Sequence, residues 1–277
     1  MVGIYSLING QQIFYSAGNQ YEKLYVHEDG DALRAMLLWR RGSDVRPMLL
    51  PWLDFRREGL PFHQAGLKLQ LLASYYHLTH DAAFFRDQRR RWLPQAERIL
   101  TGREVESGLF PREQYCGDIA DPVCSLNSNS NAWRGLRDFA AALRVMDEEG
   151  LADQMSASAS EFRAAILKAV DQSVREDARP PFVPIALFGE EQPYDSLSAT
   201  RLGGYYDLMA PLVLGSGVLG DESKRTRWMI DYLQQHGGLC MGMMRCHPAN
   251  KVYTVKQAVN DLYTLRYLLT LLRLDDV

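Results

Sequence analysis

The sequence lacks the features of several broad protein classes. Its 31 basic and 34 acidic side chains give a net charge of −3, so it lacks the basic surplus that phosphate contacts require, and nucleic-acid binding is not expected. Its four cysteines are Cys116, Cys124, Cys240 and Cys246. They are too few for a disulfide scaffold, although a disulfide within or between loops stays open, and they lack the C-x2-C pairs of zinc sites. We therefore predict no metal and no cofactor.

Long apolar segments are also missing. No run of about 18 uninterrupted apolar residues occurs, so no membrane span is expected. The first 18 residues lack a basic segment followed by a long apolar run, and so do not resemble a signal peptide. Cytoplasmic location is the default prediction, whereas a fragment of a larger secreted or periplasmic protein would show the same features. With 47% hydrophobic and 23% charged residues, the composition is that of a globular protein.

Most of the chain shows helical periodicity, after a short β segment. Two strands are predicted at residues 4–8 and 12–15 around Asn9-Gly10, a strong hairpin-turn signal. Apolar residues then recur at helical spacing, and Gly42 is the predicted stop of the first helix. The pattern predicts helices over residues 31–39, 45–57, 62–77, 82–100, 131–148, 151–174, 198–214, 222–236 and 255–274.

The links between the predicted helices alternate between short and long. Short links fall at residues 79–81, 149–150 and 215–221, and long links at 101–129, 178–197 and 237–254. Alanines near the start of successive helix pairs recur at separations of 67, 67 and 59 residues, at positions 65, 132, 199 and 258. This spacing predicts a repeated helical hairpin. Hairpins of this kind wind into two concentric layers whose long links emerge on one rim, where function is expected.

Several short motifs follow one another along this pattern. The stretch from Tyr75 to Phe85 (YYHLTHDAAFF) resembles the "yy.lTgD..fl" hairpin turn of the six-hairpin glycosidase superfamily. It is followed by Gly108-Leu-Phe-Pro111, Gly117-Asp118 and Asn131-Ala-Trp133, an order similar to the "GL.P…GD…W" passage of rhamnosidase-like toroids. Residues 21–25 with Asp29 resemble the start of an earlier hairpin. The resemblance covers about residues 21–275.

The resemblance implies an all-α fold, an (α/α) toroid of repeated helical hairpins, preceded by the short β segment. We therefore predict a β segment over residues 1–28 and one toroid domain over residues 29–277. The pattern contains about nine helices, fewer than six hairpins require. The toroid is therefore either incomplete or the C-terminal part of a larger catalytic unit. The implied activity is hydrolysis of a glycosidic bond, mostly with inversion.

Glycoside hydrolysis needs two carboxyl groups on either side of the scissile bond. The match to Gly117-Asp118 makes Asp118 the foremost catalytic candidate. The other candidates are Glu113 and Asp121 in the same link, and Glu190 and Glu191 in the link at 178–197. The alternative is that all five are solvated loop residues or helix caps. Asn129 or Asn131 is the predicted N-cap of the helix that follows.

Candidate substrate-binding residues are aromatic or cationic. Trp133 is predicted to open a helix at the rim and to stack on a sugar ring. Arg201 and Tyr205 share one helix face at i, i+4 spacing, which suits hydroxyl recognition, and Tyr206 lies beside them. The alternative for these three is core packing with a structural ion pair to Asp207. The link at 237–254 contains no carboxylate and offers only Arg245 and His247.

Three other functions stay open. The missing carboxylate at 237–254 favours a non-catalytic carbohydrate-binding or scaffold toroid. A polysaccharide lyase on the same fold would abstract a proton with Tyr205 or Tyr206 and His247. The fourth function is a helical-repeat scaffold for other proteins. The predicted partner is an oligosaccharide or glycoside, without nucleic acid or membrane, and with either a preceding domain of a larger chain or a second copy.

Overall fold

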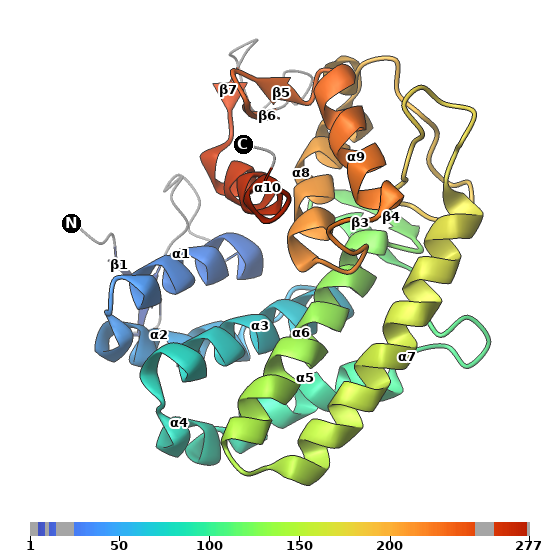
Figure 1. Ribbon diagram of the computed structural model, residues 1–277. Coiled ribbons are helices and arrows are strands. Elements are labelled where there is room, and N and C mark those ends of the chain that lie inside the picture. Colours follow the sequence, from blue (N-terminus) through green and yellow to red (C-terminus); the bar gives the residue numbers. More distant parts are fainter. Residues whose placement is uncertain (1–4, 9–10, 15–24, 247–257, 276–277) are drawn as a thin grey trace. The chain divides into compact units, whose positions relative to one another are not determined.

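The computed structural model describes residues 5–8, 11–14, 25–246 and 258–275 (Figure 1). The described chain is mostly helical, which confirms the all-α class. Its three small sheets are all antiparallel. β1 (Tyr5–Ile8) pairs with β2 (Gln11–Phe14), β3 (Glu113–Cys116) with β4 (Ile119–Val123), and β6 (Met243–Cys246) with both β5 (Leu239–Cys240) and β7 (Ala258–Val259). The predicted N-terminal β segment is thereby confirmed.

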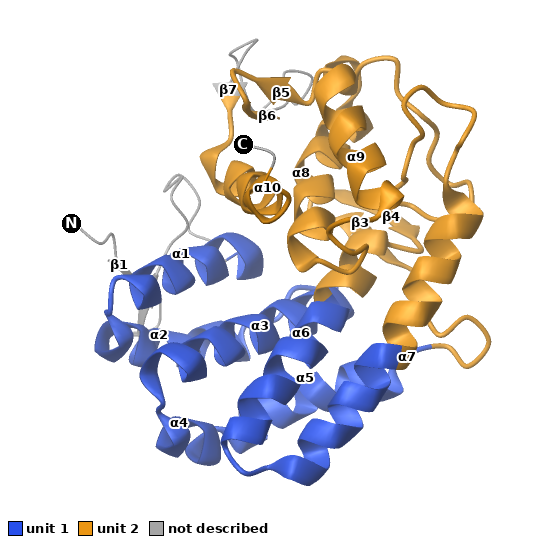
Figure 2. Cartoon of the chain, viewed as in Figure 1, with its two compact units in different colours: residues 1–103, 132–160 blue, residues 104–131, 161–277 orange. Residues whose placement is uncertain are grey.

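The chain forms two compact units, and each is discontinuous in sequence (Figure 2). Unit 1 comprises residues 1–103 and 132–160, and unit 2 comprises residues 104–131 and 161–277. Two of the three boundaries fall within α6 (Leu126–Val145) and α7 (Glu149–Ser173), and the third lies between residues 103 and 104. In the described part of the chain, no helix combines the length and apolar character that crossing a bilayer requires.

Unit 1 is organised around α3 (Pro61–Thr79), which is buried along most of its length. It packs against α1 (Val26–Leu38), α2 (Gly42–Asp54) and α5 (Arg89–Thr101). α6 crosses it at a pair of glycines, where a Cβ on Gly135 would lie 2.5 Å from the carbonyl oxygen of Gly66. The two backbones therefore approach as closely as only glycine permits.

The motif at residues 75–85 forms the turn between α3 and α4 (Ala82–Asp87). Asp81 caps α4 by accepting a hydrogen bond from the Phe84 amide at 3.0 Å. Its other oxygen accepts from the Tyr75 hydroxyl at 2.8 Å and from Arg46 Nε at 2.9 Å. His80 adopts the left-handed conformation, with φ of 54°. The predicted break at 79–81 is confirmed, and these contacts explain why the turn uses tyrosine and aspartate.

Unit 2 is organised around α8 (Arg201–Ser216), which is buried almost throughout from Gly203 onward. α8 contacts the 3-10 turn η1 (Leu197–Ala199), α9 (Lys224–Gln235), α10 (Asp261–Arg273) and β6. The Thr200 hydroxyl caps its start by accepting from the Gly203 amide at 3.0 Å. Gly217, with φ of 77°, ends it.

Several predicted helix ends differ from the observed ones. Gly42 begins α2 instead of ending the helix before it, and the predicted helix at 82–100 is interrupted at Gln88. α6 begins five residues before the predicted position because Ser125, and not Asn129 or Asn131, accepts from the Ser128 amide at 3.1 Å. The last helix begins at Asp261, after β7 has paired with β6.

The alanine spacing does not mark equivalent positions. Ala65 and Ala132 lie buried in α3 and α6, but Ala199 belongs to the 3-10 turn η1 and Ala258 to strand β7. This part of the repeat prediction is wrong, because spacing alone does not distinguish a helix from the turn or strand beside it. The toroid and its single domain over residues 29–277 stay predictions. Cys116, Cys124 and Cys240 are free thiols, so none of these three forms a disulfide.

Candidate functional site

Two of the long links predicted to share a rim meet within unit 2. The strands β3 and β4 form a hairpin in the first link, and side chains of this hairpin contact the segment from residue 185 to α8. Arg112 makes a bidentate ion pair with Glu190 at 2.8 and 2.9 Å. Tyr115 donates to Glu191 at 2.9 Å, and Tyr205 donates to Asp118 at 3.1 Å. The links at 101–129 and 178–197 are therefore neighbours.

Asp118 lies exposed in the turn between β3 and β4. Its carboxylate accepts the Tyr205 hydroxyl, and its main-chain oxygen accepts Arg201 Nη2 at 2.8 Å. The Arg201 guanidinium lies 5.7 Å from the Tyr205 ring centre. Burial, and next the charge of Asp118, raise the pKa of Tyr205 to about 12, so its hydroxyl stays protonated and is a hydrogen-bond donor. An exposed carboxylate, a phenol and a guanidinium thus lie together.

Glu191 is buried, with 1% of its surface exposed. One oxygen accepts the hydroxyls of Tyr115 and Tyr194 at 2.9 and 2.6 Å. The other accepts the amides of Ile185 and Ala186 at 2.6 and 2.9 Å. Burial raises the pKa of Glu191, and the four donors oppose that shift. Four donors fill the acceptor positions of an ionised carboxylate, so we interpret Glu191 as structural.

The Glu191 contacts hold the segment that supports the start of α6. Within this segment, the Ile185 carbonyl accepts from the Leu126 amide at 2.8 Å, and the Leu187 amide donates to the Cys124 carbonyl at 3.0 Å. Glu191 therefore fixes both the first turn of α6 and the end of the β3–β4 hairpin.

Tyr206 is fully buried, and its hydroxyl donates to the Val183 carbonyl at 3.0 Å. Its ring contacts those of Phe182, Tyr194 and Tyr232 at centroid distances of 5.2, 5.9 and 5.9 Å. The core-packing alternative therefore applies to Tyr206, whereas Tyr205, one residue earlier on α8, reaches the exposed carboxylate.

The remaining carboxylates differ in exposure. Glu113 is buried on β3, and Glu190 forms an ion pair with Arg112. Asp121 is exposed on β4. Asp118 and Asp121 are therefore exposed, as is Glu190, and of these three Glu190 makes the bidentate pair with Arg112.

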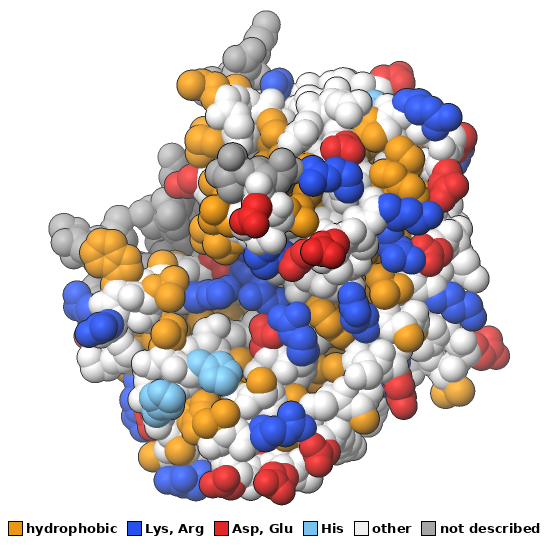
Figure 3. Space-filling model, viewed as in Figure 1, with side chains coloured by type: hydrophobic (Ala, Val, Ile, Leu, Met, Phe, Trp, Pro, Cys, Tyr) orange, Lys and Arg blue, Asp and Glu red, His pale blue; other side chains and the backbone are white. Residues whose placement is uncertain are grey.

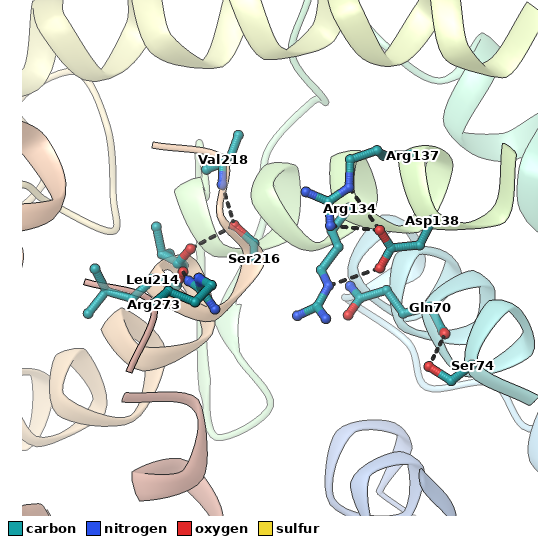
Figure 4. Close-up of polar contacts among 10 residues, drawn as sticks. Gln70, Ser74, Arg134, Arg137, Asp138, Leu214, Ser216, Val218 and Arg273 are labelled. Atoms are coloured by element: carbon teal, nitrogen blue, oxygen red, sulfur yellow. Dashed lines mark hydrogen bonds and ion pairs between the residues drawn. The ribbon is translucent and has the colours of Figure 1, made fainter. Parts of the chain in front are cut away.

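Trp133 lies in unit 1, two turns inside α6 and not at its start as predicted, because α6 begins at Leu126. It is 5% exposed, and the guanidinium carbon of Arg137 lies 4.7 Å from its ring centre. Arg137 and Arg134 share the carboxylate of Asp138 at 2.6 and 3.1 Å (Figure 4). A ring so buried and covered by a cation has little surface for stacking on a sugar.

Arg245 lies on β6, and its Nη2 donates to the Leu239 carbonyl at 3.2 Å. Its positive charge interacts with Asp207, a carboxylate on α8 that is 3% exposed. Burial raises the pKa of Asp207 well above its ordinary value, and Arg245 opposes that shift. The structure shows no ion pair between Asp207 and Arg201, the alternative expected from the sequence. His247 lies outside the described residues.

Asp207 is a buried carboxylate of unit 2 that is not among the site residues predicted from the sequence. The one signal was its position, a lone carboxylate within the otherwise apolar stretch YYDLMAPLVL of α8.

No group of three or more histidine, cysteine, aspartate or glutamate side chains within the described ranges could hold a metal ion. No protein-family model matches the chain, and no curated protein sequence matches it.

Proposed function

We propose that the protein binds a saccharide at the exposed face formed by the β3–β4 turn and the first turns of α8, and hydrolyses a glycosidic bond there. The observation that supports this most is the contact of Asp118 with Arg201 and Tyr205, which lie 83 and 87 residues later in the chain, on α8. A saccharide presents many hydroxyl groups, each both donor and acceptor. Carboxylate and phenol oxygens that accept, beside a guanidinium that donates, match that chemistry.

In this proposal Asp118 is the carboxyl group that acts on the leaving oxygen or on the attacking water. Asp121 is the second exposed carboxylate of the same hairpin and the proposed partner. Tyr205 holds the Asp118 carboxylate by its hydrogen bond at 3.1 Å, and Arg201 holds the turn through the Asp118 carbonyl. The toroid layout belongs to the same proposal, since it would place the long links on one rim.

The second candidate is a carbohydrate-binding protein without catalysis. It is favoured by the engagement of Glu190 with Arg112 and of Glu191 with four donors, because neither of these two carboxylates is then available to a two-carboxyl mechanism. The lyase alternative receives less support. A tyrosine base must lose its proton, whereas burial and the Asp118 charge raise the pKa of Tyr205 to about 12.

A screen of aryl glycosides and oligosaccharides tests the proposal with three proteins: the wild type, Asp118→Asn, and Asp153→Asn as a control. Asp153 is an exposed carboxylate of α7 that pairs with Arg144 at 2.6 Å. We expect Asp118→Asn to abolish hydrolysis with an almost unchanged Tm, and Asp153→Asn to retain activity. Full activity in Asp118→Asn would remove Asp118 from the mechanism. Binding of an oligosaccharide without turnover, weakened by Asp118→Asn, would select the non-catalytic alternative.

A further inference from the structure

The helix α10 carries a row of leucines on the side that faces solvent. Its buried face consists of Tyr263, Thr264, Arg266, Tyr267, Thr270 and Leu271. The exposed face carries four leucines at i, i+3, i+4 and i+7 spacing: Leu265, Leu268, Leu269 and Leu272, which are 48, 38, 36 and 55% exposed. We call these four residues the leucine stripe. Hydrophobic side chains are visible over α10 in Figure 3.

The orientation of α10 is fixed by its buried face. The Thr264 hydroxyl accepts from the Met244 amide of β6 at 2.9 Å. The Arg266 side chain lies against Gly215 of α8, where a Cβ would approach its Cδ to 3.1 Å. Arg273 donates to the Leu214 carbonyl at 3.2 Å (Figure 4). α10 therefore does not rotate to bury the stripe without losing these contacts. A contiguous apolar row of this kind marks an interaction surface.

The charges at the two ends of α10 indicate what covers the stripe. Asp261 is exposed at its first residue, and Arg273, at its last, keeps about a third of its side chain exposed beside Asp221. An antiparallel copy of the same helix places Asp261 opposite Arg273 of the partner subunit, and two-fold symmetry makes this pair twice. In that register Leu265 lies opposite Leu269, and Leu268 lies next to the axis. The helix dipoles are also antiparallel, which is favourable.

We propose that the leucine stripe is the interface of a homodimer, in which two α10 helices pack antiparallel across a two-fold axis. A membrane surface suits the stripe less well. Asp261 and Asp275 flank it, and anionic lipid headgroups would repel both.

Sedimentation of the full chain across a broad concentration range tests the proposal. The wild type is expected to dimerise, and Leu265→Glu to raise the dimer dissociation constant by about 100-fold or more, because a charge then faces the leucines of the other copy. Leu78→Glu is the matched control, since Leu78 on α3 is also 48% exposed. It should leave the dimer intact. A wild type that is monomeric at all concentrations, or an equal effect of both variants, would overturn the proposal.

Cysteine cross-linking tests the antiparallel register. With a rise of about 1.5 Å per residue, two copies of residue 268 lie about 3 Å apart along the axis, and two copies of residue 272 about 15 Å apart. Leu268→Cys should therefore form a disulfide-linked dimer under oxidation, and Leu272→Cys should not. Efficient linkage through Leu272→Cys would contradict the antiparallel arrangement. The wild type, with its native cysteines, is the control for background cross-linking.

Discussion

The central helices of the two units each bury an ionisable residue, but the hydrogen bonding of the two residues differs. Lys68 in α3 is 2% exposed, and its ammonium group donates to the carbonyls of Leu53 and Phe55 at 2.7 and 2.5 Å, at the end of α2. Asp207 in α8 is 3% exposed, and its Oδ1 has no hydrogen-bond partner among the described residues. Buried polar groups are usually satisfied, so Lys68 is part of the scaffold, whereas Asp207 lowers the stability of the fold when ionised.

The two residues also bias stability toward opposite pH. Burial lowers the pKa of Lys68 to about 8, and burial raises the pKa of Asp207 well above its ordinary value. The folded state therefore binds fewer protons at Lys68 and more at Asp207 than the unfolded chain does. Through linkage, the Lys68 contribution to stability rises with pH between about 8 and 10.4, whereas the Asp207 contribution falls as pH rises above about 4.

The largest expected effect concerns Lys68. Lys68→Met keeps a long side chain but leaves two buried carbonyls without their donor, so we expect a loss of about 3 kcal/mol in the free energy of unfolding. The rise in stability between pH 8 and 10 should also disappear. Lys168→Met, at an exposed position of α7, is the control and should change stability little. Urea denaturation at several pH values measures both. An equal loss in the two variants would mean that Lys68 has no special role.

A second experiment tests whether the backbone contact of α3 matters as much as its buried charge. Gly135→Ala places a methyl group 2.5 Å from the Gly66 carbonyl, so the helices must separate, at a cost of about 2 kcal/mol. Gly150→Ala is the control, because a Cβ at Gly150 of α7 meets nothing within 4 Å. It should stabilise by about 0.5 kcal/mol through helix propensity. Thermal unfolding of both variants gives the comparison. Unchanged stability in Gly135→Ala would contradict the close approach.

A smaller effect is expected at Asp207, with a distinct pH dependence. Asp207→Asn removes the ionisation, so we expect a gain of about 1 kcal/mol at pH 8 and almost none at pH 4.5, where the wild-type acid is already protonated in the folded state. Asp153→Asn, at an exposed carboxylate, is the control. Denaturation at the two pH values checks the sign. A loss of stability at pH 8 would show that the ionised Asp207 is stabilising.

The smallest effect concerns how the two helices end. Both stop at a left-handed residue, which is Gly217 after α8 and His80 after α3, with φ of 77° and 54°. His80→Gly relieves the strain of a side chain in this conformation, and we expect a gain of about 0.5 kcal/mol, reduced by loss of the His80 contact with the Tyr76 ring. His77→Gly, three residues earlier in helical conformation, should instead lose about 1 kcal/mol. A change of the same sign in the free energy of unfolding of both variants would refute this account.

Helical periodicity was sufficient to predict most of the helical core. The helix at 62–77 and the break at 79–81 agree with α3 and its turn, because their apolar spacing and capping residue are local features. Helix ends were predicted less well where a distant contact decides them. Ser125 begins α6 where the Leu126 amide pairs with Ile185, and β7 displaces the start of α10 by pairing with β6.

The candidate site was likewise predictable only where local sequence features decide it. That two long links meet was predictable from their alternation with short ones. That Glu191 is enclosed by four donors, while Asp118 stays exposed beside Tyr205, depends on side chains up to 87 residues apart. A pair of adjacent acidic residues such as Glu190-Glu191 carries no local sign that one is exposed and the other buried. Only the tertiary contacts separate them.

The interleaved sequence of the two units has a consequence for dissection. Because residues 104–131 of unit 2 interrupt unit 1, a fragment cut after residue 103 lacks the part of α6 that carries Gly135 and Phe139. During synthesis, unit 1 has all its residues only once residue 160 has been made. Unit 2 is complete only after residues 161–277 have followed. A single cut that keeps one unit whole also keeps a piece of the other, residues 104–131 with unit 1 or residues 132–160 with unit 2, so isolating one unit alone requires a circularly permuted or rejoined gene instead of a truncation.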